Sequence, residues 1–161
     1  MILKIIFILI FCARSIIADD WDSDIISTDL EKYNVNLFSN GYKIPWGMAF
    51  LPNGDLIVND ISGKMFRVTN NGAEKFEIRG VPSVNYRGQG GLLDVEVHPD
   101  FIENRLIYIS YSDIIDKPFK NISFTAVAKA RLINDELSGI EIIYKVDNHL
   151  YLSLIHISSP R

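Results

Sequence analysis

Residues 46–78 read WGMAFLPNGDLIVNDISGKMFRVTNNGAEKFEI, and this stretch decides the fold. It contains four apolar segments of about five residues each, the usual length of a short strand. The runs between them are rich in Gly, Asn, Asp and Pro. Gly and Asn tolerate a positive φ and Pro pre-sets φ, so these runs favour tight turns. The stretch therefore predicts an antiparallel meander with strands at 46–50, 56–60, 64–68 and 74–78.

The pattern then recurs along the chain. AFLPNGDLIV aligns with EVHPDFIENRLIYI, which sets Pro52 and Pro99 47 residues apart. Repeats of about 40 to 50 residues with four strands each are typical of β-propeller blades. A β-sandwich is the alternative, because short strands with regular turns suit it too. The second set of strands is expected at 92–97, 105–111, 125–132 and 140–146.

We therefore expect an all-β fold that consists of the first two four-stranded blades of a truncated propeller. Two blades do not close a ring, so their outer faces should be unburied. Tyr33–Ser39 (YNVNLFS) is a further strand candidate that could complete the last blade and seal the ring.

Composition excludes some partners. The chain has 161 residues, of which 22% are charged and 48% hydrophobic, and its formal net charge is −4. These values suit a soluble globular protein, and the scattered Lys and Arg residues give no reason to expect a nucleic-acid partner.

The first residues have the features of a signal peptide. Lys4 precedes an apolar run, 5–12, that is too short to span a membrane, and Ala18 can precede the cleavage site. We expect export to a secreted or periplasmic location, without stable membrane insertion after cleavage. A lipid anchor at Cys12 and a retained anchor are the alternatives. Cys12 is the only cysteine, so the mature chain would have neither a disulfide nor a Cys-based zinc site.

Four parts of the chain are predicted. They are the signal peptide (1–18), an N-terminal segment with the candidate ring-closing strand (19–43), a partial propeller domain (44–153) and a non-native tail (154–161). The tail, LIHISSPR, lacks the turn pattern of the repeats and resembles a reading frame that runs into library-adapter sequence.

Three runs carry a family resemblance that covers about residues 44–146. IPWGMAFLPNGDLIVNDISGKMFRV, RGQGGLLDVEVHPDFIENRLIYISYSD and TAVAKARL resemble the opening of the soluble aldose sugar dehydrogenases, also called glucose/sorbosone dehydrogenases. The resemblance implies a six-bladed propeller that binds pyrroloquinoline quinone (PQQ) with calcium near its axis. It also implies oxidation of an aldose at C1 to its lactone, in which a histidine takes the hydroxyl proton and hydride passes to the quinone. The electron acceptor is not indicated.

Gln89 is the substrate-binding residue that the resemblance implies. Its amide both donates and accepts hydrogen bonds, which suits a sugar. Gly88, Gly90 and Gly91 would allow a sharp turn and a close backbone approach before the inner strand begins. The alternative is a plain Gly-rich turn with an exposed amide. Arg87 is either a ligand of a sugar or quinone carboxylate or simply a solvated side chain.

No catalytic residue is identified within the chain, because the family's histidine segment lies beyond the expected truncation. His149 lacks the Phe-Gly that should follow it, His156 lies in the tail, and His98 is assigned to a structural turn. Calcium needs six to eight oxygen ligands, and no loop supplies that density. The carboxylates considered are Asp55, Asp60, Asp94 and Asp100. We therefore expect the ligands of calcium and PQQ to lie outside this chain.

The fragment itself is expected to be inactive. The first alternative is a non-catalytic extracellular binding module with the same fold. The second is a calcium-dependent lactone hydrolase, which would need carboxylate and asparagine ligands at the inner strand ends.

Overall fold

The computed structural model describes residues 24–27, 31–115 and 122–146, which fall into two compact units. The first unit, up to Leu37, contains an antiparallel hairpin of β1 (Asp24–Ser27) and β2 (Lys32–Val35). The expected strand at 33–39 is thus a strand only to Val35, and its ring-closing role stays a prediction. The signal peptide and the tail lie outside the described residues, as do His149 and His156.

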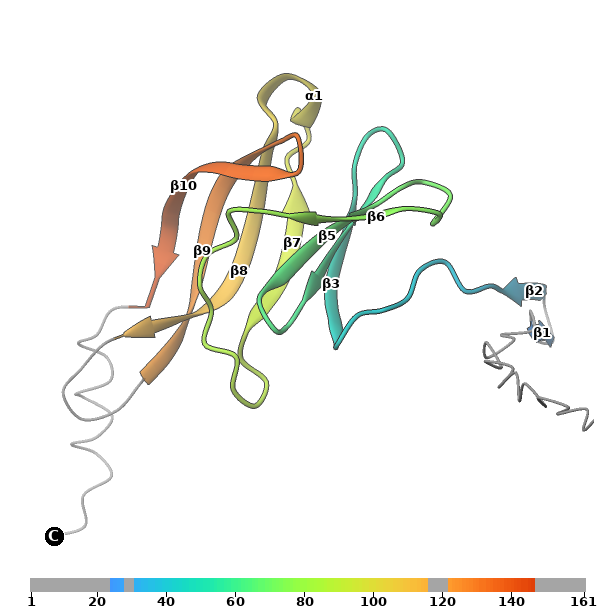
Figure 1. The fold of residues 1–161 in the computed structure, drawn as a ribbon, viewed down its shortest axis with the longest axis horizontal. Coiled ribbons are helices and arrows are strands. Elements are labelled where there is room, and N and C mark those ends of the chain that lie inside the picture. Colours follow the sequence, from blue (N-terminus) through green and yellow to red (C-terminus); the bar gives the residue numbers. More distant parts are fainter. Residues whose placement is uncertain (1–23, 28–30, 116–121, 147–161) are drawn as a thin grey trace, which may run out of the picture. The chain divides into compact units, whose positions relative to one another are not determined.

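The second unit contains two antiparallel sheets (Figure 1). The first is formed by β3 (Pro45–Phe50), β4 (Leu56–Asp60), β5 (Lys64–Val68) and β6 (Lys75–Ile78), paired in chain order. The strand bounds match the segments expected from the turn residues to within one residue.

The second sheet repeats this order with longer strands. It contains β7 (Leu92–Val97), β8 (Leu106–Ile115), β9 (Ile122–Ile133) and β10 (Glu136–Lys145), with the one-turn helix α1 (Phe101–Asn104) between β7 and β8. The prediction of two four-stranded meanders is confirmed. The expected strands at 105–111, 125–132 and 140–146 are too short. β8 and β9 pair over ten residues from Leu106–Arg131 to Ile115–Ile122, and β10 already begins at Glu136, directly after the hairpin turn.

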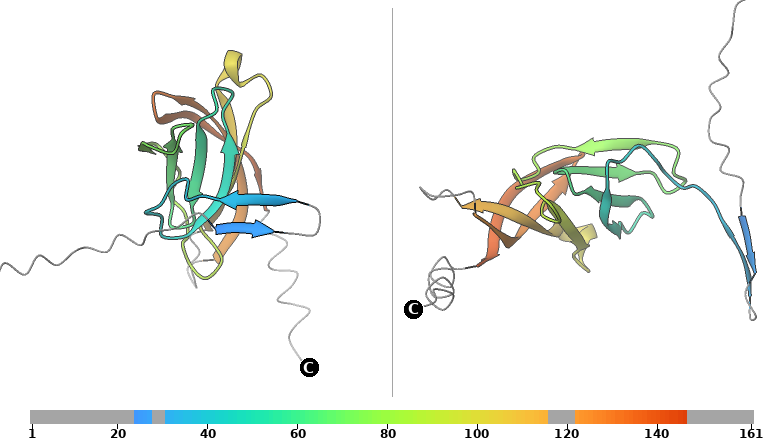
Figure 2. Two further views of the ribbon diagram at one scale, coloured as in Figure 1. Left: turned by 90° about the vertical axis from the view of Figure 1, so that its right-hand side faces the viewer. Right: turned by 90° about the horizontal axis from the view of Figure 1, so that it is seen from below.

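The core lies between the two sheets. The inner strand β7 packs against β3 and β4, and the sheets lie side by side in Figures 1 and 2. The small residues Ala126, Ala128 and Ala130 of β9 are fully buried in this core. Its large buried side chains come from both sheets: Ile57, Met65, Ile78, Leu92, Val95, Ile107 and Ile109.

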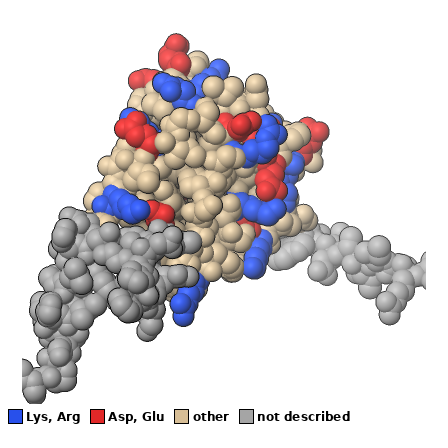
Figure 3. Space-filling view, turned by 60° about the vertical axis from the view of Figure 1, so that its left-hand side comes forward, with Lys and Arg blue, Asp and Glu red and all other residues tan. Residues whose placement is uncertain are grey.

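The outer faces of the two sheets are exposed only in part, at β3 and at β10. On the outer face of the first sheet, Leu56, Val58 and Val68 are buried, with Tyr42 packed against them. Trp46, Met48 and Phe50 alternate along β3 and are 48%, 62% and 70% exposed. On the far side, an uncharged central area is surrounded by charged side chains (Figure 3). β10 also has exposed apolar side chains, among them Ile142 and Tyr144. Within the described residues, the prediction of unburied outer faces is confirmed at β3 and β10 and is wrong at β4 and β5, where the segment that contains Tyr42 packs on the sheet.

Candidate functional site

Gln89 lies at the tip of a tight turn that precedes β7. The Arg87 N–H donates to the Gly90 carbonyl (3.2 Å), and the Gly90 N–H donates back to the Arg87 carbonyl (3.0 Å). Gly88 has a φ of +61°, whereas Gln89 is not among the residues with positive φ. This pattern defines a type II′ turn, which favours glycine at its first central position. The side chain of Gln89 is consequently exposed at the tip.

Both blades hold the base of this turn. The Gly91 N–H donates to Ser112 Oγ of β8 (3.1 Å), and the Ser112 N–H donates to the Gly91 carbonyl (2.8 Å). On the other side, the Leu92 N–H donates to the carbonyl of Ile61, which follows β4 (3.1 Å). A Cβ at Gly91 would lie 1.9 Å from that carbonyl oxygen, so only glycine fits. The sequence therefore produces the sharp turn and close approach expected of it.

Asp60 supports the turn from the first blade. Its Oδ2 accepts hydrogen bonds from the N–H groups of Lys43 (2.5 Å) and Ile44 (3.1 Å). Its Oδ1 accepts from the N–H (2.9 Å) and the hydroxyl (2.6 Å) of Ser62. Burial alone would raise the pKa of Asp60, but these hydrogen bonds outweigh it and hold the pKa below its usual range. Asp60 thereby fixes the segment that contains Ile61, the partner of β7.

The other carboxylates considered as ligands do not gather at this site. Asp55 pairs with Arg67, Asp94 accepts a hydrogen bond from the Val95 N–H, and Asp100 immediately precedes α1. Within the described ranges, no cluster of three or more His, Cys, Asp or Glu side chains is arranged to hold a metal. The described residues therefore do not fit a calcium cage.

The remaining predicted residues take local roles in the described part of the chain. Arg87 is exposed beside Gln89 and forms no ion pair with another described residue. His98 Nδ1 accepts a hydrogen bond from the Asp100 N–H (2.9 Å), and its ring stacks on Tyr108 at 6.0 Å. These contacts stabilise the turn between β7 and α1.

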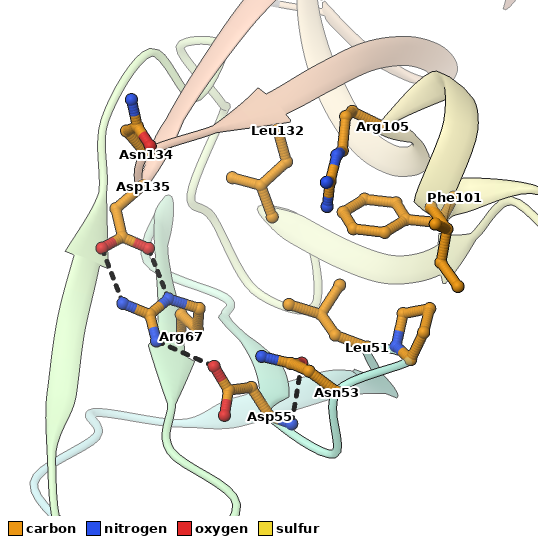
Figure 4. Close-up of a pocket in the computed structure, with 11 residues that line it drawn as sticks. Leu51, Asn53, Asp55, Arg67, Phe101, Arg105, Leu132, Asn134 and Asp135 are labelled. Atoms are coloured by element: carbon orange, nitrogen blue, oxygen red, sulfur yellow. Dashed lines mark hydrogen bonds and ion pairs between the residues drawn. The ribbon is translucent and has the colours of Figure 1, made fainter.

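A second feature, not found from the sequence, lies at the opposite end of the blades, which we call the α1 end. There a pocket of about 690 Å³ separates the β3–β4 turn from α1 and the β9–β10 turn. Arg67 donates from Nε and Nη2 to both carboxylate oxygens of Asp135 (2.6 and 2.9 Å), and from Nη1 to Asp55 (2.8 Å) (Figure 4). The hydrogen bond that Arg67 donates is the main cause of the lowered pKa of Asp135.

The turn that carries Asp135 had a recognisable signal. Asn134 and Asp135 have φ values of +50° and +56°, as in a two-residue type I′ hairpin turn, which favours Asn and Asp. The sequence contains this Asn-Asp pair between two strands. What the sequence did not reveal is that Arg67 of the other blade meets it.

Two consecutive four-stranded meanders packed through their inner strands define part of a β-propeller. The family description "Glucose / Sorbosone dehydrogenase" matches residues 42–159, and the chain belongs to this family. The matched range ends inside 154–161, and the assignment of that segment as a foreign tail stays a prediction.

Curated and solved relatives agree with this assignment. The chain is 37% identical over 108 residues to the aldose sugar dehydrogenase YliI of Escherichia coli, covering 66% of this chain and 28% of that protein. It is 34% identical over 115 residues to the uncharacterized protein slr1608 of Synechocystis, covering 66% and 27%. A solved glucose dehydrogenase superposes with a TM-score of 0.61 at 32% identity, covering 67% of this chain and 34% of that one.

The chain also superposes on a PQQ-bound aldose sugar dehydrogenase from Streptomyces coelicolor with a TM-score of 0.59 at 22% identity, covering 78% of this chain and 34% of that one. At this identity the similarity supports the fold alone. The chain thus spans about a third or less of the length of these relatives. Among the described residues, no helix is long and apolar enough to cross a membrane.

Proposed function

We propose that this chain is the N-terminal part of an exported, PQQ-dependent aldose sugar dehydrogenase that oxidises an aldose at C1 to its lactone. Family membership and the 37% identity to a named aldose sugar dehydrogenase support the reaction class. The observation that carries the proposal within the chain is the Gln89 turn. It presents an exposed amide on a backbone fixed to both blades.

Gln89 is the sugar-contacting residue in this proposal. Its amide donates to one hydroxyl oxygen and accepts from another, as a polyhydroxylated ligand requires. The type II′ turn and its contacts with Ser112 and Ile61 limit the backbone motion that binding would otherwise have to freeze. Arg87, one residue before Gly88, is placed to bind a carboxylate at the same tip.

The redox chemistry belongs to PQQ, which accepts the hydride when it is bound. The described residues contain no calcium cage, so we derive no step through either group from this chain. The base and the calcium ligands are proposed to follow Ser153 in the complete protein, and the present chain alone is proposed to be inactive.

The first test is to sequence the native transcript past the codon for Ser153. The proposal predicts about 200 further residues, the length of the remaining blades at about 45 residues each, with a His-Phe-Gly segment near their start. A continuation without that histidine would indicate a non-catalytic binding propeller. A transcript that ends at Arg161 would contradict the closed propeller itself.

The second test concerns Gln89 in the complete protein loaded with PQQ and calcium. Gln89→Ala should lower kcat/KM for the preferred aldose by about 2- to 13-fold, the value of one net hydrogen bond of about 0.5–1.5 kcal/mol. Asn70→Ala is the matched control, because Asn70 is an exposed amide in the β5–β6 turn at the α1 end. Equal kcat/KM values for Gln89→Ala and the wild type would contradict the assigned role.

A further inference from the structure

The pocket at the α1 end is lined by residues of both blades. One wall is the β3–β4 turn with Leu51 and Asn53, and the other is α1 with Phe101 and the end of β9 with Leu132. Both walls belong to one compact unit. Its volume of about 690 Å³ lies in the range of pockets that bind small molecules, about 300–1,000 Å³. The Gln89 turn lies at the other end of β7, so the two sites are separate.

The charges of this pocket are unevenly distributed. Arg67 is paired with both Asp55 and Asp135, and that cluster carries a formal net charge of −1. Arg105 lines the opposite side, and in the described part of the chain it forms no ion pair. The ring centroid of Phe101 lies 5.6 Å from its guanidinium carbon. An anion in the pocket would therefore be attracted to Arg105 and repelled from the Asp55–Asp135 side.

The backbone at Arg105 is unusual for an arginine. This residue caps the C-terminus of α1 with φ +58° and ψ +20°, and its N–H donates to the Phe101 carbonyl (2.9 Å). Glycine, and sometimes asparagine, normally occupies a left-handed cap of this kind. Here the cap carries a long cation instead, and Figure 4 shows its guanidinium directed between Phe101 and Leu132. Left-handed backbone at a non-glycine residue is a feature that clusters at ligand sites.

The rest of the lining selects the body of the ligand. Leu51, Phe101 and Leu132 are 8%, 5% and 6% exposed, and they form an apolar floor at the base of the pocket. Asn53 Oδ1 accepts a hydrogen bond from the Asp55 N–H (3.2 Å), which leaves its Nδ2 as a donor. A planar guanidinium next to an apolar floor matches a carboxylate that carries an apolar group.

From this geometry we propose that the α1-end pocket is a binding site for small organic carboxylates with an apolar body, with Arg105 as the carboxylate ligand. The carboxylate forms a two-pronged contact with the guanidinium. The apolar body lies on Phe101, Leu132 and Leu51. This site is independent of the sugar-oxidising reaction and does not require PQQ, calcium or Gln89.

Phenylacetate is the probe, titrated into the complete native protein and followed by ligand-observed NMR. With about ten non-hydrogen atoms it should bind with a Kd on the order of a few millimolar. Phenylacetamide, its neutral analogue, and 2-phenylethylamine, its cationic counterpart, should bind at least about tenfold more weakly. Equal binding of phenylacetate and phenylacetamide, or tighter binding of the amine, would overturn the proposal.

Variants locate the site. Arg105→Gln should weaken phenylacetate binding at least about tenfold, whereas Arg105→Lys should weaken it less because the charge remains. Gln is no more strained than Arg at this φ, and circular dichroism checks that the variant folds. Arg131→Gln is the matched control, because Arg131 is an exposed cation on β9 outside the pocket lining. Gln89→Ala should leave the Kd unchanged. An unchanged Kd in Arg105→Gln would refute the assignment.

Discussion

The ion pair between Arg67 and Asp135 joins the two blades across 68 residues of sequence, and its removal tests how the blades are held together. Asp135→Asn is the appropriate change. Asn accepts the φ of +56° at this position, so the backbone of the type I′ turn is retained while the charge is lost. The change replaces a bidentate contact by at most one neutral hydrogen bond, and Arg67 keeps Asp55 as a partner.

The magnitude follows from the exposure of the pair. The side chains of Arg67 and Asp135 are 22% and 24% exposed, between the surface and buried limits. Exposed ion pairs contribute about 0–1 kcal/mol, and breaking a fully buried pair costs about 3–5 kcal/mol. We therefore expect Asp135→Asn to lower the free energy of unfolding by about 1–2 kcal/mol at neutral pH.

The effect should depend on pH in a defined direction. The hydrogen bond from Arg67 lowers the pKa of Asp135 in the folded state, so the unfolded chain binds this proton more readily. The ion pair's contribution to the free energy of unfolding is therefore fully present above the pKa of Asp135 in the unfolded chain, about 4. It is lost as the pH falls through the pKa of Asp135 in the folded state. The stability difference between wild type and variant should shrink over that acidic range.

Equilibrium urea unfolding of the full chain at several pH values measures both effects. Glu77→Gln is the control, because the Lys64–Glu77 pair is 56% and 53% exposed and lies within the first blade. It should change the stability by less than about 0.5 kcal/mol. If Asp135→Asn were as stable as Glu77→Gln at neutral pH, or if its deficit did not shrink in acid, the reasoning would be refuted.

Two further stability predictions use the same assay. Gly91→Ala should cost about 2–3 kcal/mol because its Cβ would lie 1.9 Å from the Ile61 carbonyl oxygen, and an unchanged free energy of unfolding would contradict this reading. Asp60→Asn should cost about 2–3 kcal/mol, because an amide cannot accept all the hydrogen bonds that the carboxylate receives from Ser62 and the backbone. The pKa of Asp60 is lowered in the folded state, so the difference in free energy of unfolding between wild type and Asp60→Asn should diminish below pH ~4. A difference that stays constant down to the folded-state pKa would contradict this prediction.

The strands could be predicted because the local turn chemistry determines them. Asn53-Gly54 and Ser62-Gly63 lie between apolar runs, and β4 begins after the first pair and ends before the second, where β5 then begins. The ends of β8 could not be predicted in the same way. Beyond Tyr111 the strand continues through two polar residues, Ser112 and Asp113, and its length depends on pairing with β9 rather than on a local pattern.

The site was predictable only in part for a related reason. The Gly-Gln-Gly-Gly order indicates a turn with an exposed amide, and local backbone preferences produce it. The partners that fix this turn, Ser112 and Ile61, lie in different blades and are defined only once the blades pack. Apart from the Asn134-Asp135 turn, the Arg105 pocket has no local signal, because its two walls come from segments about 50 residues apart.

The two ends of the blades are joined by different chemistry, and this difference bears on how each site can change. At the Gln89 turn, the contacts between the blades are made largely by backbone groups, so the side chains at the exposed tip do not hold the blades together. Substitutions of Gln89 should therefore alter recognition with little effect on stability. At the α1 end, Arg67 and Asp135 both join the blades and line the pocket. There, a substitution that changes the pocket's charge also changes how firmly the two blades are held together.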